Sequence, residues 1–530
     1  MKRTFEIILY LIPVTIFLIL KAYSAVPFVG DENIYFYSGW ATLQGVVPFK
    51  ELPFAHPPLH LFIAVIWMVP NSINPLWLKL ASVLPATLCL IAVMFLLRRL
   101  KFSRSATFVG GLTLATTYEY LVTATHFTGA NWSMLFVVLG LTFCLKDSWR
   151  GFVAGLYLAC ATLVSLHTIP VACSLVLLSF LTNYKKRWYI VLGFGATFIT
   201  VHALCLLLFG SPYLDQLLLY HAKKTVMPDG GMETVRRFLF TTYPILVPAS
   251  LGVLLLLKDL LLNILKGERT KISLGEVHLG ALIAIIQFCA VILNSRVYSY
   301  YFAPILPLAV ILVAYTFDKG IFCLKGVMKG NGDSFRNLIL GLAFVGIAVV
   351  AGERSERELS YYAKEKNREV YYTFKPSQFL PNFINKIVEK TVFKQKRRIG
   401  EFDLGLTRYL WHEFVSPDPS VILPDLLAHK DLAGTIFGDA SSVPYLALAS
   451  GRHIALEMPD TNAQLLKSGI VKIEDLLLKL QEDLPSFIVI NPQKGIPSHN
   501  LFKKFTLENY TLLSRKRSGT LQLMLFMKKR

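Results

Sequence analysis

The chain has 530 residues, of which 54% are hydrophobic and 17% are charged, and its formal net charge is +20. Soluble proteins usually carry about 25% charged residues, so this composition, with a mean hydropathy of +0.52, excludes an ordinary soluble protein. Apolar runs recur too often for a single core and predict a polytopic α-helical membrane protein.

The first apolar run directly follows the amino terminus and is longer than the apolar part of a signal peptide, which is about 7–15 residues. We therefore expect it to stay attached as the first membrane helix. In chain order, the apolar runs predict about 11 transmembrane helices, at 6–22, 77–97, 105–122, 132–146, 151–166, 168–182, 188–209, 238–257, 275–293, 300–316 and 337–351.

Basic residues support one orientation of these helices. If the amino terminus is cytoplasmic, the loops after the second, sixth, eighth and tenth helices are cytoplasmic, and all four are basic. This pattern accounts for most of the positive charge before residue 340 without nucleic-acid binding. We expect an integral protein of the cell (plasma) membrane, with a cytoplasmic amino terminus and an external carboxyl-terminal part.

The apolar segment at 56–70, HPPLHLFIAVIWMVP, is short for a membrane span. We expect a juxtamembrane or re-entrant helix with Pro57 and Pro58 in its first turn, where proline is tolerated. If it crossed the membrane, every later loop would change sides and the basic RRLKFSR loop would become external.

The composition changes after residue 351, which divides the chain into a membrane domain, 1–351, and an external domain, 352–530. Segments within 434–495 alternate between strand-like and helical patterns, GRHIALE being the middle strand. They predict a small α/β domain with a largely parallel sheet. TLLSRKR and TLQLMLFMKKR are candidates for an added antiparallel pair.

Two adjacent carboxylates, Asp31 and Glu32, follow the first predicted helix in GDENIYFYSGWATLQG. A partly desolvated carboxylate at a membrane surface can act as a general base, because burial raises its proton affinity. The alternative is a solvated loop followed by aromatic residues of the membrane interface. The residues alone leave both interpretations open.

Other polar residues gather in the predicted external loops. Cations that depart from the positive-inside pattern suit a phosphate or pyrophosphate headgroup, and they are Lys223, Lys224, Arg236, Arg237 and Arg296. Contact with solvent or lipid headgroups is the alternative. Histidines 56, 60, 126 and 221 lie on the same side without metal-ligand spacing, so a divalent cation stays open and no metal ligand is assigned. Glu119 is a candidate for a residue facing a cavity.

The first loop, GDENIYFYSGWATLQGVVPFKELPFAHPPLHLF, and the late segment RVYSYYFAPILPLAV resemble the GT-C membrane glycosyltransferases. The branch is that of the protein O-mannosyltransferases and lipid A aminoarabinose transferases. The resemblance covers about 1–350 and rests on these matches: Asp31-Glu32, Tyr35, Gly45 to Phe49, His56 to Leu59, Tyr300, Tyr301 and Pro307. Many relatives carry a second acid just before the fourth helix, where this chain has Asn131.

This resemblance implies transfer of a sugar from a polyprenyl-phosphate donor, such as dolichyl or undecaprenyl phosphate, to an acceptor protein, lipid or glycan on the external face. Inversion at the anomeric carbon is expected. Asp31 would be the base, Glu32 would support it or bind substrate, and Arg296, Lys223 and Lys224 would stabilise the departing phosphate. The further expected substrate contacts are Tyr35, His56, His126, Asn131, Tyr300 and Tyr301. A flippase, or an assembly factor that binds polyprenyl lipid without catalysis, remains the alternative.

Overall fold

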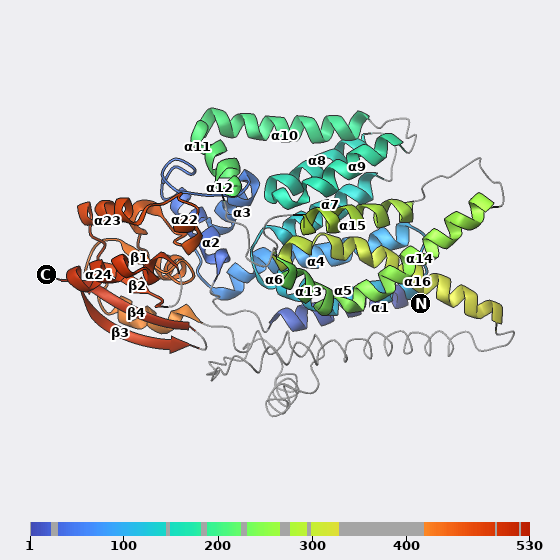
Figure 1. The fold of residues 1–530 in the computed structure, drawn as a ribbon. Coiled ribbons are helices and arrows are strands. Elements are labelled where there is room, and N and C mark those ends of the chain that lie inside the picture. Colours follow the sequence, from blue (N-terminus) through green and yellow to red (C-terminus); the bar gives the residue numbers. More distant parts are fainter. Residues whose placement is uncertain are drawn as a thin grey trace, which may run out of the picture.

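The computed structural model describes residues 2–22, 30–144, 149–181, 188–223, 231–265, 276–293, 298–327, 418–492, 495–518 and 521–529. A bundle of helices carries a C-terminal α/β domain at one end, and the N-terminus lies toward the opposite end (Figure 1). Two short helices, α2 (Asp31–Leu43) and α3 (Pro58–Met68), lie between the bundle and that domain (Figure 1). The predicted boundary at 351 falls outside the described residues.

Ten of the predicted membrane segments coincide with or overlap described helices. These helices are α1 (Lys2–Ala22), α4 (Pro75–Arg99), α5 (Arg104–Thr116), α6 (Tyr118–Thr125), α7 (Ala130–Cys144), α8 (Arg150–Val164), α9 (Ile169–Leu181), α10 (Trp188–Phe209), α14 (Tyr243–Leu265), α15 (Glu276–Ile292) and α16 (Ile305–Val327). Shorter helices connect them, namely η1 (Leu166–Thr168), α11 (Ser211–Leu214), the π-helical turn η2 (Asp215–Leu219), α12 (Tyr220–Ala222), α13 (Met232–Thr241) and η3 (Ser299–Phe302). The eleventh predicted segment, 337–351, lies outside the described residues.

By length and apolar composition, two described helices could each cross a membrane, at Leu76–Arg99 and Trp188–Phe209. Two bent pairs would raise the number to four if each pair is one broken span: α6 with α7, bent by 117°, and α13 with α14, bent by 85°. The predicted number of about 11 crossings therefore stays a prediction. Leucines on α10 such as Leu207 and Leu208 are 82% and 62% exposed, a surface suited to lipid.

The predicted continuous helix at 105–122 is wrong, because α5 ends at Thr116 and α6 begins at Tyr118. Thr117 adopts an extended conformation, and its hydroxyl donates to the Thr113 carbonyl at 2.6 Å. Hydroxyls that bond back to the preceding turn bend helices, and β-branched side chains add crowding. This break makes α6 a separate short helix, whose last residue, Thr125, is bonded to Lys21 and Lys79.

Helices α2 and α3 cross closely at Gly39. A Cβ atom at this position would lie 2.6 Å from the backbone carbon of Ala64 in α3, so the contact requires glycine. Pro58 is the first residue of α3, as predicted. The close crossing fixes α2, and therefore Asp31 at its first residue, relative to α3.

The C-terminal domain contains one mixed sheet in the order β1-β2-β4-β3. Its strands are β1 (Ile436–Gly438), β2 (Phe487–Ile490), β3 (Tyr510–Ser518) and β4 (Leu521–Lys528). Its helices are η5 (Pro419–Ile422), α20 (Leu423–Leu427), α21 (Val443–Ser450), η6 (Ala455–Glu457), α22 (Ala463–Lys467), α23 (Ile473–Glu482), η7 (Ile496–Ser498) and α24 (Asn500–Asn509). The predicted antiparallel pair is confirmed as β3 and β4. The largely parallel sheet is wrong, since β1 and β2 form the one parallel pair among the named strands.

The segment GRHIALE, predicted as the middle strand, forms η6 and makes a single bridge from Ile454 to Ile436. The prediction fails because this segment leaves the sheet toward α2. The backbone N–H of Ile454 donates to the hydroxyl of Tyr37 at 2.8 Å instead of to a neighbouring strand.

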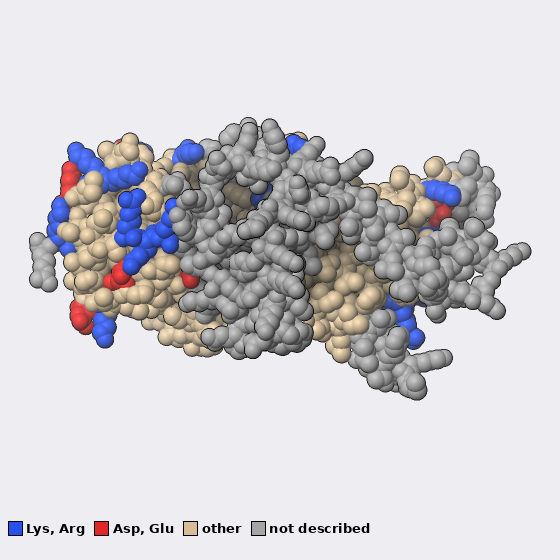
Figure 2. All heavy atoms as spheres, turned by 90° about the horizontal axis from the view of Figure 1, so that it is seen from below, with Lys and Arg blue, Asp and Glu red and all other residues tan. Residues whose placement is uncertain are grey.

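A single hydrophobic cluster joins α2 and α3 to the C-terminal domain. It contains Tyr35 and Leu61 from the helices and Phe437 and Val489 from the sheet, all buried. The two parts are therefore packed as one unit. Lys and Arg side chains gather on the visible face of the C-terminal domain (Figure 2). The exposed Arg515 to Arg517 run lies on the edge strand β3, where charge discourages further strand pairing.

Candidate active site

Asp31 and Glu32 are the first two residues of α2, and successive helical residues project about 100° apart. Asp31 is exposed, whereas Glu32 is only 3% exposed. Both carboxylates lie in the first turn, where the free backbone N–H groups favour negative charge. Adjacent residues of the same chemistry thus have different surroundings and are suited to different work.

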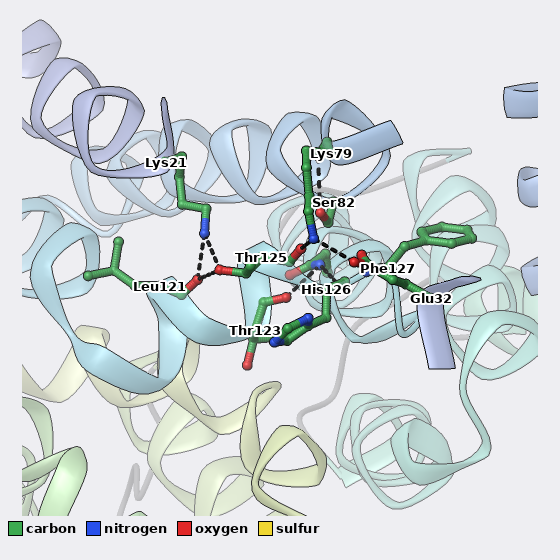
Figure 3. A network of polar contacts seen from close by, with 10 residues as sticks. Lys21, Glu32, Lys79, Ser82, Leu121, Thr123, Thr125, His126 and Phe127 are labelled. Atoms are coloured by element: carbon green, nitrogen blue, oxygen red, sulfur yellow. Dashed lines mark hydrogen bonds and ion pairs between the residues drawn. The ribbon is translucent and has the colours of Figure 1, made fainter. Parts of the chain in front are cut away.

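Glu32 is held in a buried ion pair (Figure 3). Its Oε1 accepts from Lys79 Nζ at 2.5 Å, and its Oε2 accepts from the backbone N–H of Phe127 at 3.3 Å. Lys79 also donates to the Thr125 carbonyl at 3.0 Å. Because Lys79 neutralises the carboxylate and the protein surrounds it, Glu32 is poorly placed to receive a proton from a substrate.

Sequence reasoning missed Lys79, which it placed within the second predicted span. The signal was present, since a lysine inside an apolar membrane segment is costly and needs a partner. Lys21, at the end of α1, is similarly buried and donates to the Leu121 carbonyl at 3.0 Å and to Thr125 Oγ1. Figure 3 shows both lysines converging on Thr125, so two cations hold the end of α6 in place.

Asn131 and His126 lie at the bend between α6 and α7. The Asn131 amide donates to the carbonyls of Thr123 at 2.9 Å and of His126 at 3.0 Å. Asn131 is 1% exposed, and its Oδ1 has no hydrogen-bond partner among the described residues. The contacts fit a role in holding the bend. The His126 imidazole is partly exposed and points away from Lys79 in Figure 3.

Asp31 interacts electrostatically with tyrosines from three separate segments. Its charge acts on the hydroxyls of Tyr35 in α2, Tyr220 in α12 and Tyr300 in η3. The Tyr300 ring also packs against that of Tyr301, with centroids 4.9 Å apart. The fold therefore brings together residues from the first and fourth predicted external loops and from the start of the predicted helix at 300–316.

Burial, followed by the negative charges of Asp31 and Asp460, raises the pKa of Tyr35 well above its usual value. Burial also raises the pKa of Tyr220, with Asp460 the next cause and Asp31 a smaller one. Both hydroxyls therefore stay protonated at neutral pH. Tyr220 donates its proton to Asp460 and Tyr35 is hydrogen-bonded to His56. A tyrosine oxygen also has acceptor lone pairs, so both can accept hydrogen bonds from hydroxyl groups of a substrate.

Three histidines line the side of this cluster nearest α3. The Tyr35 hydroxyl is hydrogen-bonded to His56 Nε2 at 3.0 Å, and His221 Nε2 donates to the Ala55 carbonyl at 2.6 Å. His60 is fully buried beside Tyr35, with ring centroids 4.3 Å apart, and neither of its nitrogens has a described partner. Among the described residues, no group of three or more His, Cys, Asp or Glu side chains could hold a metal ion.

The predicted cations are only partly described. Lys223 is exposed at the end of α12, whereas Lys224 and Arg296 lie outside the described residues. Arg237 has contacts within the protein: it lies 3.5 Å from the Tyr118 hydroxyl and interacts electrostatically with Glu119. Glu119 is 2% exposed and accepts from Thr241 Oγ1 at 2.7 Å. Protein contacts thus explain Arg237 on the predicted external side without a ligand.

The C-terminal domain also reaches the site. The Tyr220 hydroxyl donates to Asp460 Oδ2 at 3.3 Å, and the charge of Asp460 acts on Tyr35. Sequence reasoning missed Asp460 because it lies in an ordinary Pro-Asp-Thr-Asn turn, far along the chain from Asp31. No local pattern distinguishes it from other turn residues.

No protein-family model and no curated protein matches this sequence. The fold is similar to that of ArnT from Cupriavidus metallidurans in the apo state, with a TM-score of 0.60 and 15% identity. The same protein bound to undecaprenyl phosphate gives a TM-score of 0.56 and 15% identity. Each match covers 99% of this chain and 98% of that chain.

An oligosaccharyltransferase from Archaeoglobus fulgidus shares less, with a TM-score of 0.47, 11% identity, and coverage of 99% of this chain and 74% of that chain. The expected resemblance is therefore confirmed at the level of the fold, which this chain shares with ArnT. The similarity also extends past residue 350, where the sequence motifs end, and includes the C-terminal α/β domain.

Proposed function

We propose that this chain, which has the fold of a GT-C membrane glycosyltransferase, transfers a sugar from a polyprenyl-phosphate donor to an acceptor protein, lipid or glycan. The observation that carries the proposal is the environment of Asp31. This exposed carboxylate begins α2, and its charge acts on Tyr35 and Tyr220, whose hydroxyls stay protonated. The structure of ArnT bound to undecaprenyl phosphate, whose fold this chain shares, supports a lipid carrier of this class.

In the proposed reaction, Asp31 accepts the proton of the acceptor hydroxyl as that oxygen attacks the anomeric carbon from the face opposite the phosphate. The new carbon–oxygen bond forms while the bond to phosphate breaks, and the polyprenyl phosphate leaves with the electron pair. The configuration at the anomeric carbon inverts. A general base of this kind contributes about 10²–10⁴-fold to the rate.

Glu32 has a supporting role in this mechanism. Its ion pair with Lys79 anchors the first turn of α2 to α4, which holds Asp31 in position. Lys223, Lys224 and Arg296 remain the proposed cations for the departing phosphate. Tyr35, His56, Tyr300 and Tyr301 are the proposed contacts to the sugar and phosphate, with His126 at the edge of the site. Asn131 also remains a proposed substrate contact through its Oδ1, while its amide N–H groups serve the α6–α7 bend.

The proposal includes the place of the reaction: the external face of the cell membrane, with the amino terminus cytoplasmic and the C-terminal domain external. The second candidate is a flippase or an assembly factor that binds polyprenyl lipid without transferring the sugar. Such a protein would use the same lipid surface but would not need the Asp31 carboxylate as a base.

Purified protein in detergent would be tested with a panel of radiolabelled polyprenyl-phosphate sugars and candidate acceptors. Asp31→Asn should reduce transfer by at least about 100-fold while donor binding is retained. Asp215→Asn is the matched control, since Asp215 is another exposed aspartate of a predicted external loop. Equal transfer by wild type and Asp31→Asn would exclude Asp31 as the base. Donor binding by the wild type without transfer from any donor would favour the lipid-binding alternative.

A further inference from the structure

The segment from His453 to Asp460 connects the sheet of the C-terminal domain to α2. The Tyr37 hydroxyl accepts from the Ile454 N–H at 2.8 Å and donates to Glu457 Oε2 at 2.7 Å. Glu457 Oε1 lies 2.7 Å from His453 Nδ1. This segment is therefore held to the helix that carries Asp31 by directional polar contacts as well as by the shared hydrophobic cluster.

The backbone of this segment is strained at two successive residues. Leu456 has φ 60° and ψ 14°, and Glu457 has φ 46°, the left-handed region that side-chain-bearing residues rarely adopt. Such conformations cost on the order of 1–3 kcal/mol each and persist where the surrounding structure requires them. Here the strained turn directs the chain toward Pro459 and Asp460.

The two oxygens of Asp460 have different partners. Oδ1 accepts from the Asn462 N–H at 3.0 Å, which forms a local turn. Oδ2 faces the site and accepts from the Tyr220 hydroxyl at 3.3 Å. The charges of Asp460 and Asp31 both act on Tyr35 and on Tyr220, so the two carboxylates share the same tyrosine neighbours.

We propose that Asp460 contacts the sugar of the lipid donor, so that the C-terminal domain supplies one wall of the sugar-binding site. The inference deepens the proposed function and rests on it. A base at Asp31 must lie within hydrogen-bond reach of the oxygen that attacks the anomeric carbon. Tyr220 is hydrogen-bonded to Asp460, and its ring packs beside His221, which lies next to the His56 that is hydrogen-bonded to Tyr35. A sugar held near Asp31 and Tyr35 would therefore lie near Asp460. A carboxylate accepts hydrogen bonds from several donors at once, which suits neighbouring hydroxyls of a sugar.

The competing interpretation is that Asp460 only forms its turn. Asp460→Asn separates the two, because an asparagine side chain retains the oxygen that accepts from Asn462 and loses the negative charge. Tyr220→Phe keeps the ring and removes the hydroxyl that joins Asp460 to the site. Asp475→Asn is the control, since Asp475 is an exposed aspartate on α23 of the same domain.

The measurement is equilibrium binding to the full-length protein in detergent, which does not depend on turnover. The probes are undecaprenyl phosphate and a panel of undecaprenyl phosphates that each carry one hexose or pentose. We expect the wild type to bind at least one sugar-bearing lipid more tightly than the bare lipid. Asp460→Asn should raise the Kd of that lipid by about tenfold or more and leave the Kd of bare undecaprenyl phosphate unchanged. Tyr220→Phe should give a smaller increase of the same kind.

Equal losses of affinity for both lipids would show a structural role and overturn the proposal. An unchanged Kd in Asp460→Asn, or a wild type that favours no sugar-bearing lipid in the panel, would also overturn it. The proposed transfer activity can fail separately. In that case sugar-dependent binding would still depend on Asp460, while Asp31→Asn and the wild type would show equally little transfer.

Discussion

Replacement of Lys79 by methionine tests the buried ion pair that distinguishes Glu32 from Asp31. The pair has an Nζ–Oε1 distance of 2.5 Å, and the side chains of Lys79 and Glu32 are 6% and 3% exposed. In Lys79→Met, the Glu32 carboxylate would stay buried with one described donor, the backbone N–H of Phe127 at 3.3 Å. Removing one partner of a buried ion pair costs about 3–5 kcal/mol, because the other charge is left uncompensated.

The double variant Glu32→Gln/Lys79→Met removes both charges. A glutamine side-chain oxygen can still accept from the Phe127 N–H, and methionine fills much of the lysine volume. Replacing both members of a buried pair is often neutral, so the double variant should recover at least about 2 kcal/mol relative to Lys79→Met. With the single variant Glu32→Gln measured as well, the four proteins form a double-mutant cycle that gives the interaction energy of the pair.

The assay is unfolding of the detergent-solubilised protein by titration with SDS, followed by tryptophan fluorescence. Lys50→Met is the matched control, because Lys50 is exposed in the first predicted external loop and should change stability by less than about 0.5 kcal/mol. The reasoning is refuted if Lys79→Met is as stable as the control. It is also refuted if the free energy of unfolding falls in the double variant by the sum of the decreases in Lys79→Met and Glu32→Gln. Either result would leave Glu32 available as an alternative base.

Three further predictions use the same unfolding assay or proteolysis. Gly39→Ala should lower the free energy of unfolding by about 1–3 kcal/mol, because the added Cβ forces α2 away from α3. Gly195→Ala is the control and should not lower it, since a Cβ there meets nothing within 4 Å. Equal effects of the two substitutions would contradict the close crossing. Burial lowers the pKa of His60 to about 3, below its unfolded value of about 6.5, so the unfolded state binds more protons between these values. The free energy of unfolding should then fall by up to about 1.4 kcal/mol per unit as pH is lowered from 6.5 toward 3, and an unchanged slope in His60→Gln would refute this assignment. Tyr37→Phe removes the hydroxyl that donates to Glu457 and should speed proteolytic release of the C-terminal domain. An unchanged cleavage rate would show that the shared hydrophobic cluster alone holds the domain to α2.

Periodicity and composition predicted most of the helices and the α/β character of the C-terminal domain, because burial in lipid or in a core imposes local patterns on the sequence. The first helix, α4, α10 and the hairpin of β3 and β4 all follow such patterns. The break at Thr117 and the missing strand at GRHIALE could not be predicted from such patterns. Each depends on one hydrogen bond, and the local sequence is equally compatible with a continuous helix or with a strand.

The sequence by itself determined that two carboxylates follow the first membrane segment and that polar residues gather in a few predicted external loops. Only the tertiary structure decided which carboxylate is buried in an ion pair and which is exposed. Asp31 and Glu32 are neighbours of similar chemistry, and the buried cation that pairs with Glu32 comes from Lys79, on another helix. Asp460, from the C-terminal α/β region, accepts a hydrogen bond from Tyr220 of the site. Electrostatic interaction depends on distance in space and on the surrounding dielectric, neither of which a linear pattern of residues contains.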